Sequence, residues 1–393
     1  RVLRFLFRTE IRISRARLRL SFRYPYTCRM DISITPMLDC YWMEQALREA
    51  RGTLGRTWPN PPVGAVLVKD GLCIARGATQ IPGHNHAERE CLARAGDSAL
   101  GATLYVTLEP CSHHGRTPPC TEAVIQSRVA RVVVATLDPN PLVSGQGIRS
   151  LRDAGIAVET GCLEEEARNL MQPFFKYITT GRPWIVAKYA MTLDGRMALD
   201  SGDSFWISGE KARAEVQVLR KDAQAILVGG NTVRQDNPRL DCRIASGEWQ
   251  PARIILTAQG IPPDARLFSG GGPVHILAPE DKVSGILAGL GTRASVHGLS
   301  SLDPGPVIAW LGEHGFASVL VEAGPGILTG LVREGYVDRV RVYIAPVMAG
   351  GTGMQPIRDI GTSLMQMAPR LRGTWRNVGS DICFEGDFVP EEE

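Results

Sequence analysis

A set of metal-ligand residues between positions 84 and 120 constrains this chain more than any other feature. His86 and Glu88 open an expected helix, Cys111 follows the end of an expected strand, and Cys120 begins the next helix. One imidazole and two thiolates suit Zn²⁺, which takes nitrogen and sulfur ligands in a tetrahedral arrangement. Three protein ligands leave the fourth position for water, which is the pattern of a catalytic zinc site.

The residues around these ligands indicate hydrolytic chemistry. A catalytic zinc lowers the pKa of its water toward neutrality and so supplies hydroxide. Glu88 lies two residues beyond His86 and can carry a proton from that water to a leaving amine. Zinc deaminases carry the pattern H-x-E followed by P-C-x-x-C. This chain departs from the pattern, because eight residues instead of two separate Cys111 from Cys120.

Two alternatives compete with a catalytic zinc. The thiols could be buried and inert, as Cys91 on the same expected helix is expected to be. The zinc could also be structural, because a structural site closes its fourth position with another Cys or His. The candidates for that fourth ligand are His84, His113 and His114.

Length and composition narrow the class of protein. The chain has 393 residues, enough for two domains at roughly 100–200 residues each. It is 44% hydrophobic and 22% charged, which excludes wholesale disorder. No apolar run reaches the ~18 residues that span a bilayer. Nine cysteines are few and odd in number, which favours a reduced, cytoplasmic setting over a secreted disulfide scaffold.

Residues 1–36 form a basic extension, with nine arginines and only two acids, Glu10 and Asp31. The net charge of the whole chain is +3, so the rest is mildly acidic and does not favour a nucleic-acid-binding surface. The extension could be an organelle transit peptide or a basic arm for nucleic acid or membrane. It could also be translated upstream sequence, with the start at Met30 or Met37. We expect it to be disordered or not native and exclude it from the fold prediction.

Hydrophobic periodicity then predicts an alternating series of helices and strands, which is typical of a layered α/β domain. Asp70-Gly71 between apolar runs predicts a hairpin. The expected strands are 63–68, 72–76, 103–108, 130–136 and 156–160. The expected helices are 39–56, 87–95, 121–127, 147–154 and 164–178.

A second α/β series follows a boundary at Gly181-Arg182-Pro183. Its expected strands are 184–190, 225–228, 252–256, 273–277, 318–322 and 339–344. Its expected helices are 211–221, 281–290, 304–314 and 327–334. Glycine-rich turns follow two strands, at 229–230 and 324–326, and such turns let the backbone approach a phosphate. The glycine spacing does not match G-x-G-x-x-G, the Rossmann fingerprint for dinucleotide binding. The alternative to phosphate binding is that these glycines simply form turns.

Longer strings resemble a known family, the bifunctional deaminase/reductases of riboflavin biosynthesis. In the first half the strings are PNPPVGAVLVKDG, HAE and EPCSHHGRTPPC; in the second they are KYAMTLDGRMA, SGDSFWIS, GGNTVRQDNPRLDCR and VEAGPGILTGLV. The resemblance covers roughly residues 40–388. It implies a cytidine-deaminase-like three-layer zinc domain, which we place at 37–182. A dihydrofolate-reductase-like α/β domain that uses NADPH would follow at 183–393.

In the first domain, the resemblance implies that His86, Cys111 and Cys120 hold zinc and that Glu88 shuttles protons. Asn60 would contact the substrate. The other residues implied at this pocket are His114, Arg116 and Asn140.

In the second domain, the implied contacts surround a dinucleotide and a sugar phosphate. The cofactor contacts would be Ala190, Trp206, Thr232, Asp236, Gly324, Pro325, Gly326, Ile327, Leu328, Thr329 and Gly330. The substrate contacts would be Ser204, Arg220, Leu240, Arg243 and Glu322, with Lys188 and Asp194 near the reacting carbon. Arginines can pair a ribose phosphate bidentately, and a glutamate can accept ribose hydroxyls. Exposed surface ion pairs are the alternative for either arginine.

Two positions depart from the family pattern. Thr79 stands where many members carry His, which affects a pocket contact but not the metal site. Leu256-Thr257-Ala258 stands where an Asp and then Ser or Thr are usual, which weakens a cofactor contact.

The resemblance implies two successive reactions. The first is zinc-dependent hydrolytic deamination of 2,5-diamino-6-ribosylamino-4(3H)-pyrimidinone 5′-phosphate. The second is NADPH-dependent reduction of 5-amino-6-(5-phosphoribosylamino)uracil to its ribityl form. The alternatives are a nucleoside or tRNA deaminase with an appended domain, and a zinc-stabilised module whose basic tail docks nucleic acid. We expect a small-molecule substrate, no nucleic-acid or membrane partner, and a cytoplasmic location, with organelle targeting by residues 1–36 and homo-oligomerisation left open.

Overall fold

The computed structural model describes residues 11–14, 17–20, 32–113, 118–141, 143–204, 206–244 and 249–389. Two compact units make up the chain. The first comprises Arg1–Thr53 and Pro61–Met171, and the second comprises Leu54–Asn60 and Gln172–Glu393. Among the helices in these described segments, none combines the length and the apolar character needed to cross a bilayer.

Short strands lie within the basic extension. β1 (Ile11–Ser14) pairs antiparallel with β2 (Arg17–Leu20), which also pairs with β3 (Ile32–Ser33). α1 (Ile34–Arg51) follows directly. The helix expected over 39–56 therefore begins earlier and stops before Gly52, whose backbone freedom disfavours the helix. No regular structure was expected in the extension, so these strands are an addition to the expected fold.

The first unit is built on a five-stranded sheet. Its order is β5 (Leu72–Ala78), β4 (Gly64–Lys69), β6 (Thr103–Leu108), β7 (Arg131–Thr136) and β8 (Ala157–Thr160). β4 runs antiparallel to β5 and β6, whereas β6, β7 and β8 are parallel. The β4–β5 hairpin turns at Asp70-Gly71 with both residues at positive φ, as the Asp-Gly pair predicts.

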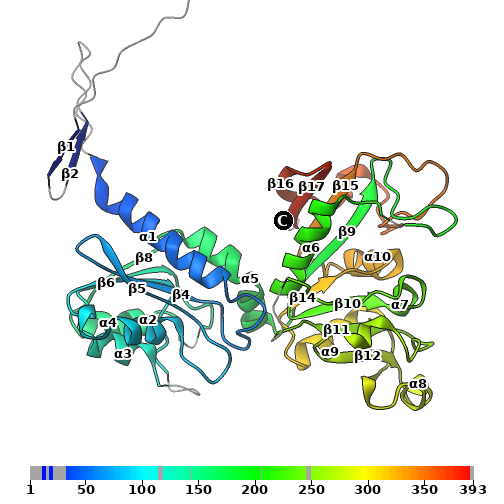
Figure 1. Cartoon of the computed structure of the whole chain (residues 1–393), viewed down its shortest axis with the longest axis horizontal. Coiled ribbons are helices and arrows are strands. Elements are labelled where there is room, and N and C mark those ends of the chain that lie inside the picture. Colours follow the sequence, from blue (N-terminus) through cyan, green and yellow to red (C-terminus); the bar gives the residue numbers. More distant parts are fainter. Residues whose placement is uncertain are drawn as a thin grey trace, which may run out of the picture. The chain divides into compact units, whose positions relative to one another are not determined.

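Helices cover both faces of this sheet (Figure 1). They are α1, α2 (Ala87–Ala95), α3 (Cys120–Gln126), α4 (Gln146–Asp153) and α5 (Glu164–Thr180), with the short 3₁₀ turn η1 (Gly96–Ala99) after α2. α1 lies on one face, close enough that a Cβ at Gly64 would be 1.9 Å from the Ala46 carbonyl oxygen. α2 lies on the opposite face, where a Cβ at Gly77 would be 2.3 Å from the Ala87 carbonyl oxygen. The expected three-layer arrangement is confirmed.

The second unit contains a nine-stranded sheet. Its order is β13 (Ser295–Leu299), β12 (Val274–Pro279), β11 (Ala252–Leu256), β10 (Ala225–Gly229), β14 (Ser318–Val321), β9 (Trp184–Thr192), β15 (Arg339–Ala345), β17 (Asp381–Phe388) and β16 (Leu371–Val378). In this order, each strand from β13 through to β15 pairs parallel with its neighbour. β17 and β16 then extend the sheet at the β15 side through antiparallel pairs. The carboxyl ends of β11, β10 and β14 therefore meet at one edge of the sheet.

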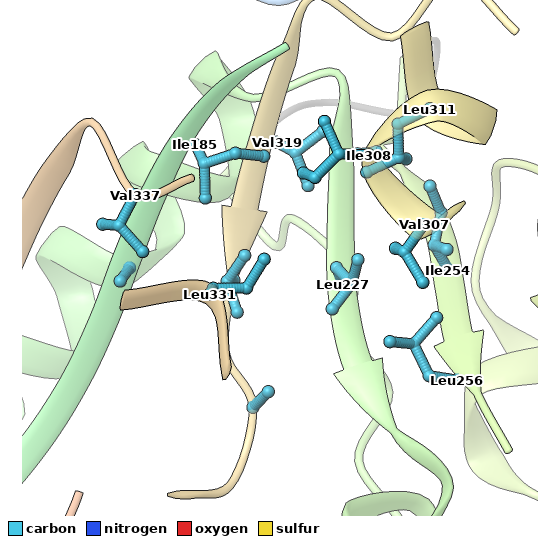
Figure 2. Close-up of a cluster of buried hydrophobic side chains, with 14 of the residues drawn as sticks. Ile185, Leu227, Ile254, Leu256, Val307, Ile308, Leu311, Val319, Leu331 and Val337 are labelled. Carbon is cyan, nitrogen blue, oxygen red and sulfur yellow. The ribbon is translucent and has the colours of Figure 1, made fainter. Parts of the chain in front are cut away.

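The helices of this unit are α6 (Glu210–Asp222), α7 (Gly230–Asp236), α8 (Val283–Leu290), α9 (Pro304–Glu313) and α10 (Pro325–Arg333). Short 3₁₀ turns lie at η2 (Arg266–Ser269), η3 (Glu280–Lys282), η4 (Gly291–Arg293) and η5 (Met365–Met367). Apolar side chains of α9 and α10 fill the space against the sheet. Figure 2 shows Ile308 and Leu311 of α9 beside Val319 of β14, with Leu227 and Ile254 on the neighbouring strands. This packing fixes the ends of β10, β11 and β14 relative to one another.

The last turns of α5 belong to the second unit. The Lys176 ammonium lies 2.7 Å from the Asp338 carboxylate, and the Tyr177 hydroxyl donates a hydrogen bond of 2.7 Å to the Gly312 carbonyl oxygen. Trp58 packs edge-on against Tyr177, with ring centroids 4.6 Å apart, which holds the segment Leu54–Asn60 there. The functional domain limits 37–182 and 183–393 remain our proposal.

Candidate active sites

The three expected zinc ligands converge in the first unit. His86 is the N-cap of α2, Cys111 is the third residue after β6, and Cys120 is the first residue of α3. His86 Nδ1 lies 3.6 Å from Cys111 Sγ and 3.4 Å from Cys120 Sγ. All three ligand atoms lie within 4.8 Å of one another. In the described part of the chain, this is the only group of three or more His, Cys, Asp or Glu residues with metal-ligand spacing.

This spacing fits zinc. With Zn–S bonds of about 2.3 Å and Zn–N bonds of about 2.0–2.1 Å, tetrahedral geometry separates nitrogen from sulfur by about 3.6 Å. The two observed distances, 3.4 and 3.6 Å, match that separation. A nitrogen and two sulfurs are also ligands that zinc prefers. These three residues would therefore hold zinc without rearrangement.

Glu88 lies beside the ligands and is buried, with 4% of its surface exposed. Burial, reinforced by the negative charge of Cys111, raises the pKa of the Glu88 carboxyl to about 7. The pKa of the Cys111 thiol is lowered to about 4, chiefly by its hydrogen bond with Cys120 and also by His86. A carboxyl group that exchanges a proton near neutral pH suits general acid–base catalysis.

Glu109 holds the Cys111 loop in place, a role that the sequence analysis missed. Its buried carboxylate accepts hydrogen bonds from four backbone N–H groups, at distances of 2.8 to 3.3 Å. The donors are Asp138, Gly145, Gly147 and Ile148, at the start of α4 and in the loop before it. A Cβ at Gly147 would lie 2.1 Å from the Pro110 carbonyl oxygen, so the glycine permits this close approach.

Glu109→Gln is expected to weaken zinc binding by about tenfold or more, because loosening the support of a ligand typically reduces metal affinity 10–100-fold. An amide in place of the carboxylate puts N–H groups against backbone N–H donors and breaks part of the anchor. Zinc affinity is measured by competition with a chromogenic chelator. Glu159→Gln removes the same charge from an exposed carboxylate on β8 and serves as the control. Equal zinc affinity in Glu109→Gln and wild type would contradict a positioning role.

Arg89 supports the Cys120 end of the loop between Cys111 and Cys120, a role that the sequence also did not indicate. Its guanidinium donates hydrogen bonds of 3.1 Å to the carbonyl oxygens of Pro118 and Pro119, directly before Cys120. The sequence around Arg89 gave no signal of this contact, because Pro118 lies 29 residues further along the chain.

The remaining residues proposed for this pocket occupy different places. His114 and Arg116 lie outside the described residues. Asn140 lies in the loop that Glu109 anchors, and its N–H donates to the Asp138 carboxylate at 2.8 Å. Asn60 lies in the segment grouped with the second unit, so its substrate contact stays a prediction. Thr79 is buried, and its hydroxyl accepts a hydrogen bond of 3.1 Å from the Val63 N–H.

In the second unit, a cavity of about 640 Å³ opens at the ends of β10, β11 and β14. It brings together eight of the residues proposed to hold cofactor or substrate: Ser204, Thr232, Asp236, Glu322, Gly324, Pro325, Gly326 and Ile327. A Cβ built at Gly324 or Gly326 meets no atom within 4 Å, so the backbone there is open to a close ligand. α10 begins at Pro325, and its N-terminal N–H groups suit a phosphate. The cavity is therefore the candidate site for a nucleotide cofactor in this unit.

The other proposed cofactor contacts lie away from that cavity. Trp206 lines a second cavity of about 370 Å³, which shares Ser204 with the first. The Arg213 guanidinium lies 4.5 Å over the Trp206 ring. Ala190 packs against a separate apolar cluster. Leu328, Thr329 and Gly330 are buried in α10, where the Thr329 hydroxyl accepts a hydrogen bond of 2.9 Å from the Arg358 N–H.

Glu322 stands at the end of β14 between two cations. Its carboxylate accepts from Arg220 Nε at 2.7 Å and Nη2 at 3.2 Å, and Lys188 Nζ lies 3.6 Å away. Although burial acts in the opposite direction, these cations lower the pKa of Glu322 to about 2. Burial lowers the pKa of Lys188. Arg220 Nη1 also donates to the Asp241 carbonyl oxygen at 3.2 Å, so the three nitrogens of this arginine are engaged within the protein.

The last two proposed substrate contacts differ from each other. Arg243 is 57% exposed in its side chain and lies 3.3 Å from the Asp241 carboxylate. Leu240 is buried in the apolar cluster beneath α7 and adopts a positive φ of 52°. The pKa of Asp194 is lowered by the hydrogen bond that its carboxylate accepts from the Thr192 hydroxyl, and also by those from the Ala349 and Gly350 N–H groups.

Comparison with known proteins places both units in one family. The cytidine and deoxycytidylate deaminase zinc-binding region matches residues 37–136, and the RibD C-terminal domain matches residues 183–384. Riboflavin biosynthesis protein RibD of Aquifex aeolicus is 43% identical over 351 residues, which cover 88% of this chain and 97% of the relative. RibD of Escherichia coli is 38% identical, with 88% of this chain and 98% of the relative covered. The chain belongs to the RibD family.

Solved structures of the RibD family agree with this assignment. Acinetobacter baumannii RibD superposes with a TM-score of 0.81 at 37% identity, covering 90% of this chain and 99% of the relative. A diaminohydroxyphosphoribosylaminopyrimidine deaminase/5-amino-6-(5-phosphoribosylamino)uracil reductase of Thermotoga maritima gives 0.81 at 36% identity, covering 90% and 100%. The chain is therefore a bifunctional deaminase and reductase of riboflavin biosynthesis, and the expected fold class is confirmed.

Proposed function

We propose that the chain hydrolytically deaminates 2,5-diamino-6-ribosylamino-4(3H)-pyrimidinone 5′-phosphate and then reduces the resulting 5-amino-6-(5-phosphoribosylamino)uracil with NADPH. The observation that carries the proposal is the convergence of His86, Cys111 and Cys120 at zinc spacing beside a buried Glu88. The name of the Thermotoga maritima relative supports the choice of substrate and product. A reduced, cytoplasmic setting is part of the proposal, because the eight cysteines in the described segments are free thiols.

In the deamination, Glu88 moves the protons. When bound by the three ligands, zinc supplies a nucleophile at neutral pH. Glu88 takes a proton from the attacking water and returns it to the amine that leaves as ammonia. Its raised pKa near 7 lets the carboxyl act in both directions. Glu109 and Arg89 keep the two thiols in place while the substrate exchanges.

In the reduction, the cavity residues position the cofactor and the sugar. When bound, NADPH supplies the hydride, and the protein supplies orientation and electrostatics. The turn at Gly324 and Gly326 and the start of α10 would hold its pyrophosphate. Glu322 would accept ribose hydroxyls. Arg243, whose guanidinium is largely exposed, is better placed than Arg220 to pair the substrate phosphate, since Arg220 is occupied by Glu322.

Product analysis by mass spectrometry tests both steps. The zinc-loaded protein is incubated with the diaminopyrimidine ribosyl phosphate, with and without NADPH. We expect the amino group to be lost without NADPH, and the ribityl product to form only when NADPH is added. Reduction without deamination, or deamination without reduction, would refute the corresponding half of the proposal.

Zinc removal is expected to separate the two activities. The three zinc ligands all lie in the first unit, whereas the cavity at β10, β11 and β14 lies in the second. A chelator should therefore abolish deamination and leave reduction of the uracil intermediate unchanged. Adding zinc back should restore deamination. Loss of both activities on chelation would contradict independent sites.

A further inference from the structure

A pair of histidines stands at the edge of the nine-stranded sheet, outside both candidate active sites. His275 lies on β12, and His297 lies on the edge strand β13. In the parallel register Leu277 is the partner of His297, so the two histidines point to the same face, two residues apart along the ladder. α9 covers that face, because Leu277 and Trp310 of α9 belong to one apolar cluster.

The two imidazoles present their nitrogens to each other at a distance that suits a shared metal ion. His275 Nδ1 lies 3.1 Å from His297 Nε2. At metal–nitrogen bond lengths of about 2.0–2.1 Å, two nitrogens on one ion are about 2.9 Å apart at a right angle and about 3.3 Å apart in a tetrahedron. The observed separation lies between these values. Both rings can therefore bind one ion where they stand, and a hydrogen bond between the rings is the alternative.

Packing holds the pair in this arrangement while leaving it within reach of solvent. The ring of Trp310 is buried, and its centroid lies 4.8 Å from that of His297 and 5.7 Å from that of His275. Both histidines are only partly buried. Ligands whose orientation is fixed in advance by packing lose little freedom when a metal binds, which favours affinity. Imidazole binds metals in its neutral form, which dominates at pH 7 because the ordinary pKa of histidine is about 6.5.

We infer that His275 and His297 form a second metal site, which takes a divalent transition metal that prefers imidazole, such as Ni²⁺, Zn²⁺ or Cu²⁺. The bound ion would join the edge strand β13 to β12. His314, at the end of α9, is not one of the ligands. Its Nδ1 donates to the Trp310 carbonyl oxygen at 2.9 Å. Among the described residues, the three histidines do not form a set whose ligand atoms all lie within 4.8 Å of one another.

Calorimetric titration of the full-length protein with Ni²⁺ tests the inference. The protein is first loaded with zinc and freed of excess, so that the site at His86 is already occupied, and its zinc content is measured again after the titration. We expect wild type to bind one Ni²⁺ per chain. His275→Asn and His297→Asn should each raise Kd for Ni²⁺ by at least about tenfold, because each removes one of the two ligands.

Thermal unfolding gives a second measurement on the same proteins. An ion that binds only the folded state stabilises it, so Ni²⁺ should raise the melting temperature of wild type but not that of His275→Asn or His297→Asn. A cooperative transition without Ni²⁺ shows that each variant is folded.

His314→Asn is the matched control, since it removes a histidine from the same cluster but keeps both ligands. It should change Kd for Ni²⁺ by less than about twofold. If wild type bound no Ni²⁺ while keeping its zinc, the pair would be a plain hydrogen bond and the inference would be wrong. Unchanged affinity in His275→Asn and His297→Asn would place the ion elsewhere and also overturn it. An equal loss in all three variants would contradict the assignment to these two ligands.

Discussion

Glu88→Gln is expected to lower kcat for deamination by about 10³-fold, within the range that a positioned general acid–base contributes. Glutamine has nearly the same shape as the buried carboxyl but cannot take up and return a proton. The zinc ligands are untouched, so the variant should still bind one zinc per chain. Reduction of the uracil intermediate should be unchanged, because the cavity for that step lies in the other unit. Ammonia release and zinc content are measured on the same preparation.

Glu90→Gln is the matched control for this variant. Glu90 lies on the same helix, two residues further on, and pairs with Arg94 at 2.7 Å on a more exposed face. The Glu90→Gln variant should keep nearly all of the deaminase activity. Removing an i,i+4 ion pair from a helix surface changes the free energy of unfolding by only about 0.3–0.5 kcal/mol. Deamination at the wild-type rate by Glu88→Gln, with zinc bound, would exclude Glu88 as the proton carrier.

The zinc ligands could be predicted because each coincides with a local signal. His86 opens a helix, Cys111 follows a buried strand, and Cys120 begins a helix after a proline. Parallel pairing of β6 with β7 then brings the loop ends to one edge of the sheet. Glu109 carried a weaker signal, an acid directly after a buried strand, and its partners on α4, Gly147 and Ile148, lie 38 and 39 residues away.

Contacts that depend on strand order could not be predicted in the same way. Arg220 and Glu322 are 102 residues apart, and both were assigned to the substrate. Arg220 lies in the last turn of α6, and Glu322 is the residue after β14. They pair because β10, which follows α6 in the chain, lies beside β14 in the sheet. The hydrogen bond between Arg234 and Thr257 was not predicted for a similar reason, because Thr257 follows β11, the strand beside β10.

The missed elements lack the patterns on which sequence prediction depends. β16 is almost entirely exposed on both faces, so its residues show no alternation of apolar and polar side chains. β13 is a short edge strand without a continuous apolar run. α7 begins at Gly230, and Gly229-Gly230 was interpreted as a turn. The longer helices and the central strands have strong periodicity, and their predicted limits lie close to those observed.

Glu322→Gln is expected to lower the free energy of unfolding at pH 7 by about 3 kcal/mol. The folded-state pKa of Glu322 is lowered to about 2 from the ordinary value of 4.5, and each unit corresponds to about 1.4 kcal/mol. Breaking a buried ion pair by removing one partner costs a similar amount, about 3–5 kcal/mol, because it leaves charge uncompensated. Here the charges left behind are the guanidinium of Arg220 and the ammonium of Lys188.

The same shift sets the pH dependence. Because the carboxyl has a lower pKa in the folded state than in the unfolded state, its contribution is complete above pH 4.5 and disappears as pH falls toward 2. The stability difference between wild type and Glu322→Gln should therefore shrink between pH 4.5 and 2. Urea unfolding of the full-length chain, monitored by tryptophan fluorescence, measures this difference in the free energy of unfolding at each pH. Glu313→Gln, on the exposed side of α9, is the control and should match wild type throughout. A difference that grows on acidification would show that Glu322 is not held ionised by its two cations.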